Sequence, residues 1–371
     1  MAAVSGHADE SDAEAKRKQR TEAFHQTLNK ISGTLGAFGL GFLIPIVKLC
    51  AGESPMEQLR ALWVQLFVPL IGIAVFLLAW AYSAPQVQTS LGAIPGPAQV
   101  WDQAKSLYAA HIAEGEKAEA FYERQEKRNE RLVEINKKRV AEGKEPRPIK
   151  IREYTGSPTY IDQIWTSIGT VALGFIVATV FAVPLGIMCG LSPTVNGALN
   201  PLIQIFKPVS PLAWLPIVTM VVSAAYASPW EWLPKAMLIS AITVTLCSLW
   251  PTLINTALGV SSIDKDLLNV GKVLRLPTWQ TITKIVLPSS LPLIFTGMRL
   301  SLGVGWMVLI AAEMLAQNPG LGKFVWDEFQ NGSSQSLAKI MVAVLTIGLI
   351  GFLLDRIMYA LQAAFTFSAN R

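Results

Sequence analysis

Long apolar runs separated by short polar segments dominate this sequence. A helix needs ~20 predominantly apolar residues to cross a bilayer core, and six runs are long enough: 62 to 83, 164 to 190, 209 to 227, 235 to 259, 293 to 316 and 338 to 363. We therefore predict an all-α, polytopic membrane protein with about six transmembrane helices. The last five runs form one core domain, 164–371, which follows a first transmembrane helix at 62–83.

The region before the first of these runs has a polar part and an apolar part. Residues 1–30 contain the basic cluster Lys16 to Arg20 and no cleavable signal pattern, which predicts a cytoplasmic tail. Residues 31–61 begin with an apolar stretch that contains four glycines, Pro45 and Lys48. That stretch could be an extra span or a helix lying in the membrane interface, and we favour the interface.

Charged residues gather in the segment 84–163. Between Asp102 and Glu153 lie 13 basic and 11 acidic side chains, out of 57 charged residues in the chain. Residues 109–140 are strong helix formers with opposite charges four positions apart, as in Glu123 and Lys127, so we predict a solvated helix or helical hairpin inserted between the first two spans. With the basic tail inside, the number of spans places 84–163 on the periplasmic side, and the near balance of charges permits this.

Composition supports membrane insertion and offers little catalytic chemistry. Hydrophobic residues make up 51% of the chain and charged residues 15%. The net charge of +5 fits basic residues at membrane borders and gives no argument for nucleic acid. Three cysteines lie in or beside apolar runs without CxxC or Cys/His spacing, so neither a metal site nor a disulfide framework is indicated. The three histidines lie outside the spans, which removes the usual proton-relay candidates.

A polar helix–turn–helix, 264–288, separates two of the long apolar runs. Apolar residues recur in each half at helical spacing, which gives each half one apolar face. Leu276-Pro277 should break the first helix, Thr278 can cap the second, and Pro288 should end it. Gly271 removes a side chain where a neighbour could pack closely.

This segment resembles the EAA loop of ABC importer permeases, the cytoplasmic coupling helix that docks into an ATPase subunit. The resemblance rests on Gly271, Lys272, Trp279 and Leu287-Pro288, while Leu268-Asn269-Val270 stands in place of the EAA letters. It implies the following ATPase-coupling residues: Leu267, Val270, Gly271, Lys272, Leu274, Pro277, Trp279 and Pro288. Among these, Leu267, Gly271, Leu274 and Trp279 are our candidates for the docking face.

Further motifs extend the resemblance from about residue 62 to the end of the chain and leave the charged block as an insertion. Four of them look like the nitrate/sulfonate/taurine/bicarbonate class of ABC permeases: IPGPAQVW at 94–101, PLGI through GLS at 184–192, PLIQ at 201–204 and KPVSPLAWLP at 207–216. Four others are most similar to the nitrate and bicarbonate permeases: FTGMR at 295–299, AAEML at 311–315, WDEF at 326–329 and GFLLDR at 351–356.

The resemblance implies a type I ABC importer permease, multi-pass in the cell inner membrane and surrounded by membrane lipid. It would move a small inorganic anion by alternating access, with nitrate the first candidate and bicarbonate, taurine or another sulfonate, and cyanate as alternatives. The implied partners are a second permease copy in a homodimer, two ABC ATPase subunits and a periplasmic substrate-binding protein. ATP and Mg would be bound by the ATPase partners, so this chain would not be an enzyme. Gly320 to Lys323 lacks the leading glycine and the hydroxyl residue of a phosphate-binding loop.

Candidate pathway residues are Arg299, Trp214 and Trp306. The planar donor fork of Arg299 suits nitrate or bicarbonate, although snorkelling or pairing within the protein would also explain an arginine six residues into a span. The tryptophans could line the path or serve helix packing and interfacial belts. Glu313 would repel an anion, so we expect it in a gate or in structural pairing. Three prolines between 208 and 216 break a helix, as part of a gate or as a re-entry turn.

Two other classes of protein compete with this interpretation. A secondary transporter would usually show inverted repeats and central carboxylates, and the sequence shows neither an internal repeat nor a central Asp or Glu in the spans. A membrane enzyme would need a His/Cys/carboxylate cluster or a serine elbow, and the sequence has no such pattern. The charged block is either a landing surface for the binding protein or a spacer without a partner.

Overall fold

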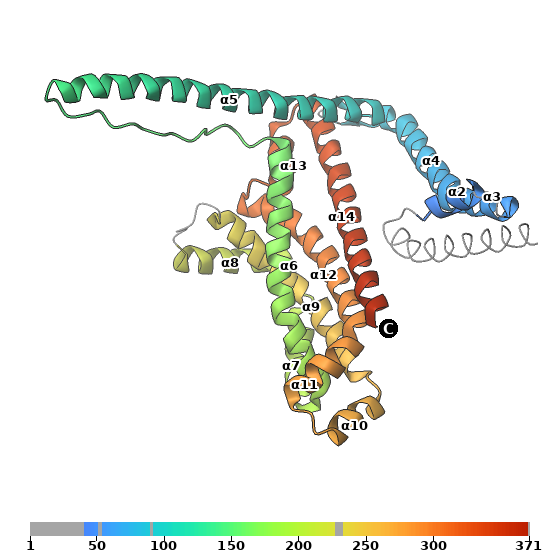
Figure 1. Ribbon diagram of the computed structural model, residues 1–371. Coiled ribbons are helices and arrows are strands. Elements are labelled where there is room, and N and C mark those ends of the chain that lie inside the picture. The colour runs from blue at the N-terminus through green and yellow to red at the C-terminus, as the bar shows by residue number, and fades with distance from the viewer. Residues whose placement is uncertain (1–40, 51–53, 90–91, 227–232, 370–371) are drawn as a thin grey trace, which may run out of the picture.

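The computed structural model describes residues 41–50, 54–89, 92–226 and 233–369, and these are almost wholly helical. The only described strands form a small antiparallel hairpin of β1 (Gln88–Thr89) and β2 (Gly92–Ala93). The all-α prediction is therefore confirmed. Figure 1 shows a bundle of long helices and a further long helix, α5, that crosses one end of the bundle.

Five helical runs are long and apolar enough to cross a membrane. They are Pro55–Gln86, Tyr160–Leu191, Lys235–Ser261, Thr278–Ala316 and Gln335–Phe365. The first joins α3 (Pro55–Leu62), a π-helical turn (Trp63–Phe67), α4 (Val68–Ser83) and a 3₁₀ turn (Ala84–Gln86). The others contain α6 (Tyr160–Leu191), α9 (Lys235–Ser261), α12 (Leu287–Ala316) and α14 (Ser334–Ala369).

The sixth expected span, 209 to 227, has a different form from the prediction. Its helix α8 (Pro211–Ala225) has 15 residues, which at 1.5 Å per residue gives about 22 Å, less than a bilayer core of about 30 Å. It follows α7 (Pro193–Phe206) across a bend of 101°. A sixth span exists only if this bent pair counts as one broken crossing. Pro211 accounts for part of the break, because a proline disfavours a helical conformation in the residue before it, and Ser210 is extended with ψ 142°.

The region 31–61, predicted as an interfacial or extra apolar helix, divides between a short helix and the start of the first span. Residues 31–40 lie outside the described residues. Helix α2 (Leu43–Cys50) has eight residues and is too short to cross a membrane. From Pro55 onward the chain already belongs to the first span, which starts seven residues before the predicted boundary at 62.

Helices α6, α9 and α12 form the tightly packed centre. Small residues allow this approach: a Cβ added to Gly174 would lie 2.7 Å from the carbonyl oxygen of Ala241, and one added to Gly190 would lie 2.5 Å from Val260 Cβ. Buried hydroxyls link the same helices, as in the 2.7 Å contact between Thr252 Oγ1 and Ser301 Oγ. Such small and hydroxyl residues at helix contacts are typical of packing inside membranes.

Helix α4 stands apart from this centre (Figure 1). In the helical run Pro55–Gln86, to which it belongs, only 6% of the most apolar 18-residue window is buried by other described residues. Trp80, near its end, packs against the apolar cluster that α5 and α14 share with the bundle. Most of its apolar surface is therefore left to lipid or to another protein chain.

The charged insertion forms a long arm. Helix α5 (Pro97–Ala141) has 45 residues, or about 67 Å at 1.5 Å per residue. Residues 142–159, here called the strap, return along it without helix or strand. The helix predicted over 109–140 is therefore confirmed as one continuous helix. Short α13 (Leu321–Asn331) lies at the same end of the bundle as the base of this arm (Figure 1).

Candidate functional site

The loop predicted to couple to an ATPase forms the end of the molecule opposite α5 (Figure 1). Its first helix, α10 (Lys265–Val273), is capped by Asp264, whose side chain accepts a hydrogen bond from the backbone N–H of Asp266 at 3.0 Å. At its other end, the N–H of Leu276 donates to the carbonyl of Gly271 at 3.0 Å, and the N–H of Arg275 donates to the carbonyl of Lys272, also at 3.0 Å. This is a Schellman ending, with a left-handed Arg275 (φ 49°) in the position that usually holds glycine.

Five apolar side chains of this loop face outward. Val273 is 80% exposed and Trp279 74% exposed, and the whole set, here called the coupling patch, consists of Leu267, Val270, Val273, Leu274 and Trp279. Lys272 and Pro277 are exposed beside it. A cluster of exposed apolar groups at the tip of a polar loop indicates a protein-binding surface.

Gly271 does not lie on this patch. It is buried, and a Cβ added to it would lie 3.0 Å from Ile285 Cδ1 in the second half of the same loop. Of the four residues predicted for the docking face, Gly271 alone is absent from the exposed set. It lies where a neighbour packs closely, as expected from sequence, and that neighbour is the other half of the loop.

The prediction that Pro288 ends the second helix was also wrong. After α11 (Thr278–Thr281), the chain passes through a π-helical turn (Ile282–Val286) directly into α12 and remains helical to Ala316. Proline cannot donate a backbone hydrogen bond, and a wider turn just before it accommodates that loss within a continuous helix. The first span uses the same solution, with a π turn (Trp63–Phe67) immediately before Pro69. The loop is thus joined rigidly to a membrane helix.

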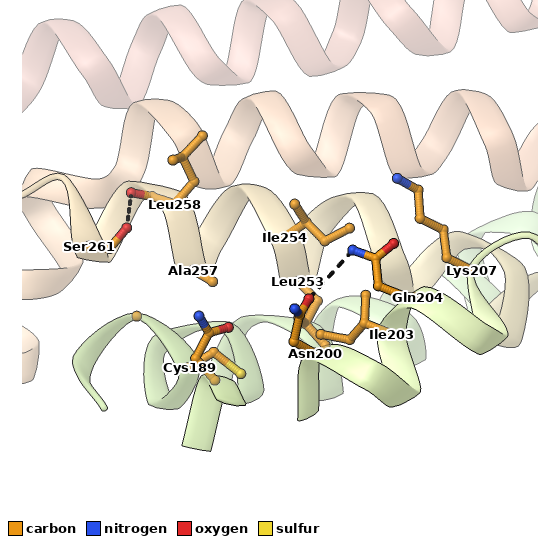
Figure 2. Close-up of a pocket in the computed structure, with 12 residues that line it drawn as sticks. Cys189, Asn200, Ile203, Gln204, Lys207, Leu253, Ile254, Ala257, Leu258 and Ser261 are labelled. Carbon is orange, nitrogen blue, oxygen red and sulfur yellow. Dashed lines mark hydrogen bonds between the residues drawn. The ribbon is translucent and has the colours of Figure 1, made fainter. Parts of the chain in front are cut away.

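A pocket with a polar side lies between α6, α7 and α9 (Figure 2). Helix α7 is at the end of the bundle that carries the loop (Figure 1). Its volume is about 320 Å³. Cys189 and Gly190 come from the end of α6, and Leu253, Ile254, Ala257, Leu258 and Ser261 from the last turns of α9. The apolar wall from α9 faces a more polar wall from α7.

The α7 wall carries three carboxamides and one ammonium group. Asn196, Asn200 and Gln204 recur every four residues and Lys207 follows after three, so they share one face of the helix. Figure 2 shows Gln204 and Lys207 reaching from α7 toward α9, with the Gln204 amide 3.5 Å from the Asn200 oxygen. Among the residues that the structure describes, no carboxylate lies within ion-pair distance of Lys207. A cation and amide donors beside an apolar wall suit a small anion.

The three pathway residues predicted from sequence do not line this pocket. Arg299 donates two hydrogen bonds to Asp355 of α14, one of them 2.8 Å from Nη2 to Oδ2, and lies over the Tyr359 ring. Trp306 is buried and donates to the Ile347 carbonyl at 3.0 Å. Trp214, on α8, lines a separate apolar pocket. Arg299 and Trp306 thus join α12 to α14, and a part in transport stays a prediction for all three.

Glu313 occupies a buried polar centre at the opposite end from the loop. Its carboxylate accepts hydrogen bonds from Ser167 Oγ at 2.8 and 2.9 Å and from the Gly322 N–H at 3.0 Å. Ser167 also accepts one from the Leu321 N–H at 2.8 Å. The carboxylate therefore ties α6 and α12 to the first turn of α13, which is the kind of structural pairing predicted for it.

The pocket on α7 was missed in the sequence. The four-residue recurrence of carboxamides in an otherwise apolar segment was a usable signal, because it puts polar side chains on one face of a helix whose other faces are apolar. Whether they faced lipid, protein or a cavity depended on the bend between α7 and α8 and on the contact with α9. Sequence spacing alone does not determine either.

Known proteins are similar to the part of the chain that contains the loop 264–288 and the α7 pocket. Residues 182–366 match the family model described as binding-protein-dependent transport system inner membrane component. The nitrate import permease protein NrtB of Leptolyngbya laminosa is 37% identical over 205 residues, 54% of this chain and 68% of that protein. The bicarbonate transport system permease protein CmpB of Synechocystis sp. is 40% identical over 195 residues, 52% of this chain and 65% of that protein.

A third relative carries a different name and is more distant. The taurine transport system permease protein TauC of Escherichia coli is 32% identical over 200 residues, 54% of this chain and 68% of that protein. The loop 264–288 and the α7 pocket fall within residues 182–366, whereas the arm lies outside them. The chain therefore belongs to the family of binding-protein-dependent transport system inner membrane components, as a multi-pass permease subunit of the nitrate, bicarbonate and taurine class of ABC importers.

Proposed function

We propose that this chain forms the membrane path of an ATP-driven importer for nitrate. The observation that carries the proposal is the pocket of Asn196, Asn200, Gln204 and Lys207, which places one unpaired ammonium group and several amide donors beside an apolar wall. A singly charged oxyanion can replace its hydration shell with such donors. Among the described residues that line the pocket, none carries a carboxylate that would repel it.

Nitrate is the first candidate because NrtB matches over the longer stretch, 37% identical over 205 residues, and bicarbonate is the second because CmpB is 40% identical over 195 residues. Both are small planar anions of one negative charge, and an ammonium group with amide donors accepts either. Taurine carries an ammonium group of its own, so Lys207 would repel one end of it. The pocket therefore favours the planar oxyanions over the sulfonate.

Movement of the anion requires free energy from outside this chain. We infer that an ATPase subunit docks on the coupling patch, where Trp279 and Val273 are largely exposed. Because Thr278–Ala316 is one helical run, displacement of the patch moves α12 as a rigid element. Helix α12 packs along α9, which forms one wall of the pocket. Nucleotide-driven motion at the loop would thus widen or narrow the pocket.

Three kinds of partner follow from this proposal. The ATPase subunits bind ATP and Mg and carry out hydrolysis on the cytoplasmic side. A substrate-binding protein delivers the anion at the end that carries α5 and α13. A second copy of this chain completes the path, since one copy leaves the pocket open and α4 without a neighbour along most of its length.

Uptake into proteoliposomes tests the proposal. The complex with its ATPase and binding protein should accumulate labelled nitrate when ATP is supplied on the loop side, and uptake should continue after the proton gradient is collapsed. Uptake that needs the proton gradient and ignores ATP would identify a secondary transporter instead.

The pocket is tested by changing its charge at one position. Lys207→Gln should lower nitrate uptake and Lys207→Arg should restore most of it, because the arginine keeps the positive charge at the same place. ATPase stimulation by the loaded binding protein should change less than uptake. Equal uptake by wild-type and Lys207→Gln would remove the pocket from the transport path.

A further inference from the structure

The arm of α5 and the strap has a use that transport through the bundle does not explain. It extends across the ends of α6 and α14, at right angles to the spans in appearance, and much of it extends past the bundle (Figure 1). A helix in this orientation lies parallel to the membrane surface. The family match begins at residue 182 and does not include it.

The strap is fixed along α5 by a series of hydrogen bonds. The Asn136 side chain bonds both the N–H and the carbonyl of Arg147, at 2.7 and 2.8 Å, and Gln125 accepts from the Arg152 N–H at 2.8 Å. Nearer the bundle, the Tyr154 hydroxyl donates to Glu114 at 2.6 Å. These contacts run along most of the helix, so the arm is a two-layered rod whose strap has a defined outer face.

That outer face lies toward the membrane. Figure 1 shows the strap on the side of α5 from which α6 descends. Two of its apolar side chains have no cover: Ile151 is 81% exposed, and Ile149 is also exposed. In a rod surrounded by water on all sides these isoleucines would remain unburied, whereas at a bilayer surface they would enter the interface.

Charge is divided unequally along the arm. Residues 102–126 contain three basic and six acidic side chains, whereas residues 127–152 contain ten basic and four acidic ones. The basic half is the part farthest from the bundle and includes the strap residues around the two isoleucines. Lysine and arginine beside exposed apolar groups, on a rod parallel to the membrane, are complementary to anionic phospholipid headgroups.

We propose that the distal half of the arm, residues 127–152, lies on the outer leaflet and binds anionic phospholipid headgroups. The basic side chains contact the phosphates, and Ile149 and Ile151 enter the interface beneath them. The arm would then fix the orientation of the bundle relative to the membrane surface and concentrate anionic lipid at its outer end. This role is independent of which anion the bundle transports.

Spin-label depth measurements on the full chain test the proposal. After the native cysteines are replaced, a label is placed at Ile151→Cys on the strap or, as a matched control, at Glu134→Cys on the exposed opposite face of α5. The chain is studied in nanodiscs of phosphatidylcholine with or without phosphatidylglycerol. With phosphatidylglycerol, the label at 151 should lie about 5–10 Å into the interface, protected from a water-soluble nickel chelate and accessible to oxygen, while the label at 134 stays in water.

Neutralising the charges should remove this difference. With Lys144, Arg147, Lys150 and Arg152 all changed to Gln, the label at 151 should return to the aqueous phase. Equal exposure of labels 151 and 134 in both lipid mixtures would overturn the proposal, as would equal insertion with and without phosphatidylglycerol. Protection of position 151 that appears only on addition of the substrate-binding protein would also overturn it and would make the arm a protein-docking surface.

Discussion

Truncating Trp279 gives the sharpest test of the docking surface. The side chain is 74% exposed at the tip of the molecule, although its large apolar ring would be more stable out of water. A tryptophan contributes roughly 150–250 Å² on burial, so the exposed part amounts to about 110–190 Å². At ~25 cal/mol per Å² this area corresponds to about 3–5 kcal/mol as an upper bound on its contribution to binding.

Measured hot-spot truncations at interfaces commonly cost about 2–4 kcal/mol, which is roughly a 30- to 900-fold loss of affinity. We therefore expect Trp279→Ala to weaken association of the purified permease with its ATPase subunit by that factor in a titration in detergent. The fold of the permease should be unaffected, because the ring contacts little in the isolated chain.

Trp101 provides a matched control. It is 68% exposed on α5, at the opposite end of the molecule, so Trp101→Ala removes a similar exposed ring without touching the loop. Association with the ATPase should remain at the wild-type level in this variant. If Trp279→Ala binds the ATPase as wild type does, or if both variants lose affinity equally, the coupling patch is not the docking surface.

Three further predictions concern packing and pH. Ser167→Ala leaves a buried carboxylate and a buried backbone N–H each short of a hydrogen bond, so the free energy of unfolding should fall by about 1.5–3 kcal/mol in thermal melts; an unchanged melting temperature would contradict this. Gly174→Ala puts a Cβ 2.7 Å from a carbonyl oxygen of α9 and should lower the free energy of unfolding by about 1–3 kcal/mol. In Gly169→Ala the nearest atom to the new Cβ is 3.8 Å away, so the free energy of unfolding should not change. Equal effects of the two substitutions would show that the contact at Gly174 relaxes freely. The pKa of Glu114 is lowered below its usual 4.5, first by the hydrogen bond from Tyr154 and second by nearby Lys117. The ionised Glu114 therefore stabilises the strap above pH 4.5, and this stabilisation is lost as the pH falls through the lowered pKa. Strap amides in Glu114→Gln should exchange faster than wild type near pH 7 and at the same rate in strong acid, and a difference that persists in acid would contradict the assignment.

The sequence predicted most spans because apolar run length is a direct requirement of the bilayer. It was less informative where proline intervened. Pro288 and Pro69 both lie inside continuous helical runs, since a π turn immediately before each accommodates the missing N–H. The prolines at 208 and 211, by contrast, accompany a bend of 101°. Proline alone does not distinguish these outcomes, because the packing of neighbouring helices decides whether the chain can turn.

The candidate site residues also divide into those that local sequence predicts and those that depend on packing between distant segments. Helical spacing predicted three members of the coupling patch, Leu267, Val270 and Leu274, and the resemblance to the EAA loop added Trp279. The inward position of Gly271 depends on a contact with Ile285 in the other half of the loop, which spacing does not reveal. The pairing of Arg299 with Asp355 joins residues 56 positions apart and likewise needs the packed bundle.

We infer that a small planar anion, delivered by a binding protein, drives the cycle of this permease. The most direct measurement is the ATPase activity of the reconstituted complex with its binding protein, compared across nitrate, bicarbonate, cyanate and taurine. We expect the greatest stimulation with nitrate, less with bicarbonate, and little with taurine. Stimulation by taurine above both planar anions would contradict the proposed cargo, and hydrolysis that responds to none of the four would contradict the assignment to small-anion import.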